Sequence, residues 1–89
     1  PNNKEEVKVE YAGINRITHD AYIFLLEGNK DHLYSISENH PCIKKLLNKN
    51  KLQKGKKFTI RYEKVDKKSD DGLLFTFNED NKELEIIEV

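Results

Sequence analysis

Hydrophobic and polar residues alternate in two segments of the chain, and this two-residue period is typical of strands with one buried face. The first segment, VKVEY at residues 7–11, places Val7, Val9 and Tyr11 on the same face. The second segment, KFTIRYEKV at residues 57–65, is the clearest strand pattern in the chain. Both segments are therefore expected to cover a hydrophobic core from one side.

Two further strands are expected between these segments. AYIFLL, residues 21–26, is apolar at every position, as in a central strand that is covered on both faces. EGNKD, residues 27–31, is a turn sequence, and HLYSIS, residues 32–37, is expected to return as the second arm of a hairpin. Gly13 lies inside a continuing strand pattern and indicates a bulge or a sharp bend there.

The C-terminal part of the chain contains two more strand patterns. LLFTF, residues 73–77, and ELEIIEV, residues 83–89, are expected to form a last hairpin across NEDNK, residues 78–82. DKKSDDG, residues 66–72, ends in an Asp-Gly turn signal and is expected to be a polar loop. The chain thus has three expected strands on each side of its middle segment.

The middle segment predicts one short helix at about residues 42–51. Pro41 suits the first helical position, with Asn39 or His40 as the N-cap residue. Gly55 is expected to close the helix. The apolar stripe consists of Ile43, Leu46 and Leu47, at the spacing of a helix that packs one face against a core.

The resulting fold class is mainly β with one short helix, in the order βββ-α-βββ. This order, with the Gly-bent first strand and the helix between the third and fourth strands, resembles the OB-fold, a small β-barrel. The resemblance covers nearly the whole chain but concerns the fold only and identifies no family. An SH3-like barrel, or an α+β sheet with the helix on one face, remains an alternative.

The length of 89 residues is sufficient for one domain. We expect a flexible N-terminal segment at residues 1–6 and a single barrel-like domain at residues 7–89. The chain has no Met and begins with PNNKEE, so we expect it to be a processed product or a domain of a longer protein. No segment has the apolar length of a membrane span, and no membrane partner is expected.

The net charge of zero conceals a strong segregation along the chain. Residues 44–68 contain eleven basic residues against Glu63 and Asp66, a net charge of +9. Residues 69–89 contain seven acidic residues against Lys82, a net charge of −6. The basic block is therefore the main electrostatic feature of the sequence.

His40 and Cys42 are the residues most reminiscent of nucleophilic catalysis. A Cys near a helix N-terminus has a stabilised thiolate, and a nearby His can act as its base. Side chains at i and i+2 do not face each other on a helix, however. A capping His followed by a small buried Cys is the favoured interpretation, and no enzymatic activity is expected. The single Cys also excludes an intramolecular disulfide, which favours a reducing compartment.

No residue pattern in the sequence indicates a metal or cofactor site. Zinc sites use paired ligands at short spacing, whereas His19, His32, His40 and Cys42 are scattered. The loop at residues 66–72 lacks the ligand spacing of a calcium-binding EF-hand loop. The four glycines are isolated and form no phosphate-binding loop. No cofactor is expected.

Two functional hypotheses follow. The first is a non-catalytic module that binds a protein partner or the rest of a parent chain, guided by charge complementarity or by an open edge strand at residues 7–11 or 84–89. The alternative is single-stranded nucleic-acid binding, in which basic side chains contact phosphates and outward tyrosines stack on bases. The candidate residues for that surface are Lys44, Lys45, Lys49, Lys54, Lys56, Lys57, Arg61, Tyr22 and Tyr34.

Overall fold

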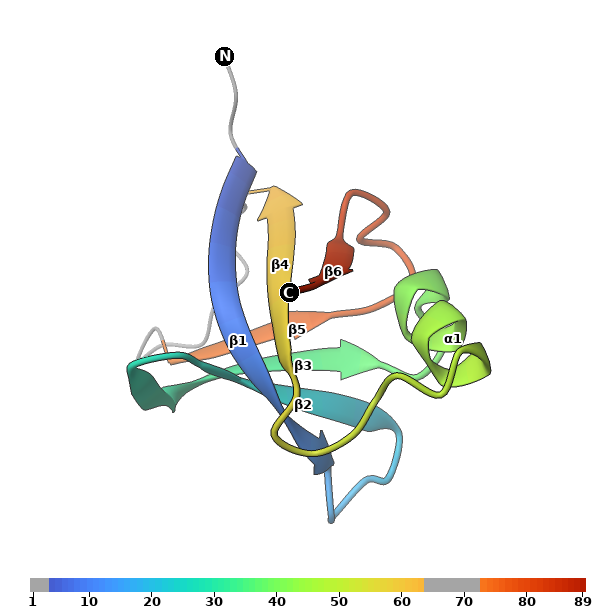
Figure 1. The fold of residues 1–89 in the computed structure, drawn as a ribbon. Coiled ribbons are helices and arrows are strands. Elements are labelled where there is room, and N and C mark those ends of the chain that lie inside the picture. The colour runs from blue at the N-terminus through green and yellow to red at the C-terminus, as the bar shows by residue number, and fades with distance from the viewer. Residues whose placement is uncertain (1–3, 64–72) are drawn as a thin grey trace.

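The structure is a computed structural model, which describes residues 4–63 and 73–89. These residues form six strands and one helix in the expected order (Figure 1). The fold class, mainly β with one short helix, is thereby confirmed. The elements are β1 (Lys4–Ile14), β2 (Ala21–Leu26), β3 (Asn29–Ser37), α1 (Pro41–Asn48), β4 (Lys57–Glu63), β5 (Leu74–Phe77) and β6 (Glu85–Glu88).

The six strands form one curled sheet, a half-barrel, in the order β5-β3-β2-β1-β4-β6. Neighbouring strands are antiparallel except for β3 and β5, which are parallel. The expected hairpin between the last two strands is wrong, because β5 pairs with β3 and β6 pairs with β4. Alternation shows that a segment is a strand but leaves its partner open. The loop at residues 78–84 consequently connects the two opposite edges of the sheet.

Strand β1 is longer than expected and is bent. Residues 4–6, placed in the flexible N-terminal segment by the sequence, belong to this strand, where Lys4 pairs with Glu63 and Glu6 with Arg61. The register with β2 shifts between Tyr11 and Gly13, which confirms the predicted bulge. Gly13 has a φ of 114°, a conformation that L side chains rarely adopt. Residues 1–3 and the predicted polar loop at 66–72 lie outside the described residues.

The core lies on the concave side of the curled sheet and is completed by the helix. Phe58, Ile60 and Tyr62, the apolar positions of the alternating β4 segment, are buried, and so are Val9 and Tyr11 of β1. Helix α1 contributes Ile43 and Leu46. The whole set is Val9, Tyr11, Tyr22, Phe24, Tyr34, Ile36, Ile43, Leu46, Phe58, Ile60, Tyr62, Phe77 and Leu84. Most of the aromatic side chains thus serve the core.

Helix α1 is shorter than the predicted 42–51. The backbone N–H groups of Asn50 and Lys51 donate to the carbonyl oxygens of Leu47 and Leu46, at 3.0 and 2.9 Å. Asn50 adopts a φ of 56°, so these bonds form a Schellman motif with Asn, and the prediction that Gly55 closes the helix is wrong. The stripe is also narrower than predicted, since Leu47 is 44% exposed. Among the described residues, no helix has the length and apolarity needed to cross a membrane.

Candidate functional site

The two tyrosines predicted to stack on bases are part of the core. Tyr22 and Tyr34 are 9% and 1% exposed. Burial raises the pKa of Tyr34, and a hydrogen bond with the side chain of Tyr62 raises it further. Tyr22 packs with Tyr11 at a ring-centroid distance of 6.2 Å. Both rings lie on the concave face of β2 and β3, so neither can receive a base.

Arg61, the arginine of the predicted basic surface, is engaged by two glutamates. Its Nη2 atom lies 2.9 Å from Oε2 of Glu6, and its Nη1 atom lies 3.4 Å from Oε1 of Glu85. The hydrogen bond and the charge of Glu6 raise the pKa of the guanidinium group. Glu6 and Glu85 lie on the strands that flank Arg61 on both sides, because β4 lies between β1 and β6. This arrangement neutralises much of the field of Arg61.

Lys56 and Lys57 are paired in the same way. Lys56 Nζ lies 2.7 Å from Oε1 of Glu88, on the neighbouring strand β6. Lys57 Nζ lies 3.6 Å from a carboxylate oxygen of Glu10 and 3.5 Å from one of Glu27. Strand β6 places its glutamates beside the basic residues of β4, because these two strands pair. Lys56, Lys57 and Arg61 therefore each lie beside carboxylates that offset their charge.

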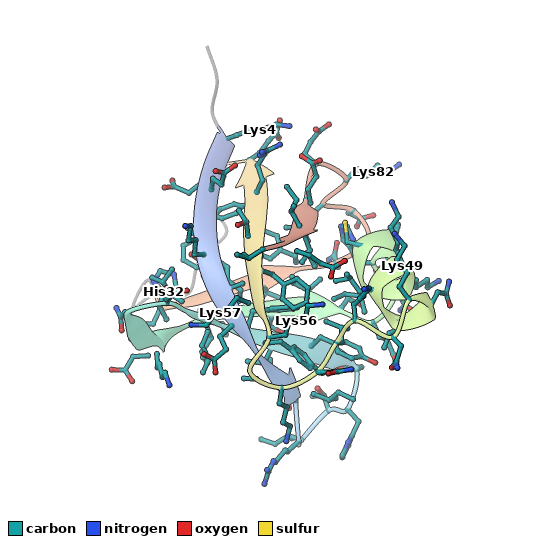
Figure 2. The ribbon with its side chains drawn as sticks, in the orientation of Figure 1. Lys4, His32, Lys49, Lys56, Lys57 and Lys82 are labelled. Carbon is teal, nitrogen blue, oxygen red and sulfur yellow. The ribbon has the colours of Figure 1, made fainter. Side chains whose placement is uncertain are left out.

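The other four predicted lysines are exposed and form no ion pair among the described residues. Lys44 and Lys45 lie on α1, and Lys49 is the C-cap residue of that helix. Lys54 lies in the following loop, and its Cε atom is 2.8 Å from the position that a Cβ on Gly13 would occupy. Figure 2 places Lys49 beside the helix, whereas Lys56 and Lys57 lie near the start of β4. The predicted residues are thus divided between two regions.

His40 and Cys42 hold the start of the helix and the loop at residues 78–84 together. His40 Nδ1 accepts a hydrogen bond from the Cys42 backbone N–H at 3.1 Å, and its Nε2 atom donates to the Asn81 carbonyl oxygen at 2.8 Å. Nδ1 accepts from an amide, so the ring is the neutral tautomer with hydrogen on Nε2. Cys42 Sγ donates to the Leu84 carbonyl oxygen at 2.9 Å, and burial raises the pKa of the thiol. His40 is the N-cap residue, as one of the two predicted alternatives.

The loop held by these contacts is also ordered from within. The Asn81 side-chain oxygen accepts from the Asn78 backbone N–H at 2.9 Å, and the Asn78 side-chain oxygen accepts from the Asp80 backbone N–H at 2.8 Å. The Asn81 backbone N–H donates to the Asn78 carbonyl oxygen at 3.0 Å. Side chains of this type stabilise tight turns by bonding to the nearby backbone. The loop is therefore a set of bonded turns between β5 and β6.

This loop forms one wall of a pocket of about 300 Å³ beside the ends of β4 and β5. The floor consists of Tyr62 from β4, Phe77 from β5 and Leu84 from the end of the loop. All three are at most 6% exposed. The rim consists of Glu63, Asp80, Asn81, Lys82 and Glu83. Figure 2 shows Lys4 at the start of β1 and Lys82 at the loop before β6.

The residue pattern of the chain contains no indication of this pocket. The pocket exists because β5 and β6 pair with different strands, and the sequence pattern predicted that they pair with each other. The one available signal was the NEDNK segment, whose Asn and Asp residues indicate an ordered turn. That signal points to a turn but contains nothing about the strand ends on either side of it.

One of the two predicted edge strands is an edge of the sheet in the structure. Residues 7–11 lie inside the sheet, between β2 and β4, so the prediction of an edge there is wrong. Strand β6 is an edge of the sheet, as predicted for residues 84–89. Part of its outer side is already bonded, since the Cys42 thiol contacts the Leu84 carbonyl and the Ile86 backbone. Only a short length of β6 is left for another strand.

Within residues 4–63 and 73–89, no group of three or more His, Cys, Asp or Glu side chains is placed to hold a metal ion. The chain matches no known protein family, no curated protein and no solved structure. Two features of the described residues are therefore candidates for a binding site. One is the pocket beside the loop at residues 78–84, and the other is the set of lysines without an ion pair, Lys44, Lys45, Lys49 and Lys54.

Proposed function

We propose that this domain is a non-catalytic protein-interaction module that binds its partner at the open side of the half-barrel. The observation that supports this best is the pocket at the ends of β4 and β5, with its apolar floor and its polar rim. Concave sites with an apolar base and a few polar groups are the usual form of binding sites. The bonded turns of the loop and its attachment to α1 hold the wall of this pocket in place.

The arrangement of His40 and Cys42 supports a module without catalytic chemistry. Both nitrogen atoms of the His40 ring are bonded to backbone groups, and the ring is 1% exposed. A nucleophilic Cys requires a lowered thiol pKa, whereas burial raises the pKa of Cys42. The two side chains therefore fit a structural role at the helix start.

The outer face of β2 and β3 also favours a protein partner over nucleic acid. OB-folds bind oligonucleotides on the face of strands 2 and 3 and on adjoining loops. Here the residues that alternate with the buried positions of these strands are Ala21, Ile23, Leu25, Leu33, Ser35 and Ser37. Stacking and phosphate contacts require aromatic and basic side chains, and this set has neither.

Single-stranded nucleic-acid binding remains the second candidate, because Lys44, Lys45, Lys49 and Lys54 have no ion pair among the described residues. Phosphate contacts by these lysines would make the affinity fall steeply with salt. A labelled oligonucleotide titrated at low and high salt tests this candidate. Absence of binding at low salt would eliminate it.

The proposed function can be tested by selecting peptides from a displayed random library on the wild-type domain. The selected peptides are then titrated against two variants. Glu63→Trp places an indole at the rim of the pocket, and Glu38→Trp places one at an exposed position outside the pocket lining. We expect Glu63→Trp to weaken binding by at least about tenfold and Glu38→Trp to leave it within about twofold, because a few central residues carry most of the binding energy of an interface. A library that yields no binder, or binders insensitive to Glu63→Trp, would contradict the proposal.

A further inference from the structure

We infer that the pocket at the ends of β4 and β5, walled by the loop at residues 78–84, receives a basic side chain, Lys or Arg, of the partner protein. This inference rests on the proposed function and specifies what the pocket recognises. It depends on the charge of the rim, the nature of the floor and the size of the cavity.

The rim is dominated by carboxylates. In the part of the chain that the structure describes, the pocket is lined by three carboxylates, Glu63, Asp80 and Glu83, and by one cation, Lys82. Among the described residues, Glu63 and Asp80 form no ion pair, while Glu83 lies 3.6 Å from the Nζ atom of Lys4. An anionic occupant would meet like charges, whereas a cation gains from the two unpaired carboxylates. The rim therefore selects for positive charge.

The floor suits the same occupant. The rings of Tyr62 and Phe77 lie 5.3 Å apart between centroids and meet edge to face. The face of an aromatic ring attracts a cation, and guanidinium groups also stack on such rings. Lys and Arg have long apolar stems that can lie along Leu84 while the charged end stays at the wet rim. A basic side chain thus matches both the floor and the rim.

The volume limits the occupant to something small. A cavity of about 300 Å³ is at the lower end of the range for ligand sites. One extended side chain fits this size better than a large cofactor does. Because the loop is held by His40 and by its own turns, little ordering is required when the side chain enters. The geometry thus describes a preformed socket for one residue of a partner.

The test uses small analogues of that residue. The ¹⁵N-labelled domain is titrated with N-acetyl-arginine amide, N-acetyl-lysine amide and N-acetyl-citrulline amide, and amide chemical shifts are recorded. Citrulline has the shape of arginine without its charge. We expect the two cationic probes to shift the amides of Glu63, Phe77 and residues 80–84, and the citrulline probe to bind at least about threefold more weakly, since exposed charge pairs are each modest in strength.

Two variants complete the test. Glu63→Gln combined with Asp80→Asn removes the unpaired charges with little change of shape and should weaken the cationic probes about three- to tenfold. Glu79→Gln removes a charge from the same loop outside the pocket lining and should leave them unchanged. The inference is overturned if the citrulline probe binds equally well, if the double variant binds as the wild type does, or if no probe shifts the pocket amides. In each of these cases the peptide selection decides separately whether the domain is an interaction module.

Discussion

The Nε2 atom of His40 donates a hydrogen bond to the carbonyl oxygen of Asn81, 2.8 Å away, and so joins the start of α1 to the wall of the pocket. The same imidazole caps the helix through its Nδ1 atom. One buried side chain therefore links two segments that are 41 positions apart in the sequence. The stability of the helix and the shape of the pocket depend on the same ring.

Replacing His40 should therefore destabilise the protein. His40→Ala removes the cap and leaves the Asn81 carbonyl without this donor, at a cost of about 1–3 kcal/mol in the free energy of unfolding. His40→Asn retains a capping acceptor but not the bond to Asn81, and should have an intermediate effect. The measurement is urea-induced unfolding followed by circular dichroism.

Asn39→Ala is the control for this prediction, because Asn39 was the other N-cap candidate and is exposed. It should change the free energy of unfolding by less than about 0.5 kcal/mol. If Asn39→Ala proved as destabilising as His40→Ala, the assignment of the cap to His40 would be incorrect.

The thiol of Cys42 should react slowly with iodoacetamide in the native protein. Burial raises its pKa, and the contact with the Leu84 carbonyl occupies its hydrogen. Since the thiolate is the reacting species, native Cys42 should be alkylated more slowly than free cysteine at pH 7.5, and as fast as free cysteine in urea. Labelling is followed by mass spectrometry. If the native thiol were alkylated faster than free cysteine, that result would support a catalytic role for Cys42.

The ion pairs of Glu88 should make stability depend on pH in the acid range. The hydrogen bond from Lys56 lowers the pKa of Glu88, and the charge of Lys51, 3.7 Å away, also lowers it. A carboxyl whose pKa is lower in the folded state stabilises the protein above its unfolded pKa, and this stabilisation disappears as the pH falls through the folded pKa. The urea concentration at the unfolding midpoint should decrease as the pH is lowered from 6 to 3. This decrease should be smaller in Glu88→Gln.

Glu79→Gln serves as the control, since Glu79 is exposed and forms no ion pair among the described residues. It should retain the acid sensitivity of the wild type. An identical pH profile for Glu88→Gln and the wild type would mean that the Lys56–Glu88 contact adds nothing to folding stability.

Gly13→Ala should destabilise the bent strand by about 1–3 kcal/mol, because the φ of 114° is strained for any residue with a Cβ. The Lys54 stem lies over this position but is flexible enough to shift. Adding Lys54→Ala should therefore not restore the lost stability in a double-mutant cycle measured by urea unfolding. Full restoration would show that crowding, and not the backbone, requires glycine here.

The local elements of this protein follow from its residue order. Strand β2 occupies residues 21–26 as its apolar run predicts, Gly13 lies at the bulge, and Pro41 opens the helix. These features depend on side-chain period, φ preference and a missing N–H group, which are properties of a few adjacent residues. The inward positions of β4 follow for the same reason.

The features at the candidate sites depend instead on which distant segments meet. Tyr22 and Tyr34 face the core because of how the sheet curls. The charged Arg61 is paired with Glu6 and Glu85 because β4 lies between β1 and β6. The pocket forms because β5 pairs with β3 while β6 pairs with β4. Strand pairing joins residues that are far apart in the sequence. The alternation of residues within a strand does not specify which other strand becomes its partner. The residue pattern therefore defines the strands of this protein, and the folded sheet decides which charges cancel and where a pocket remains.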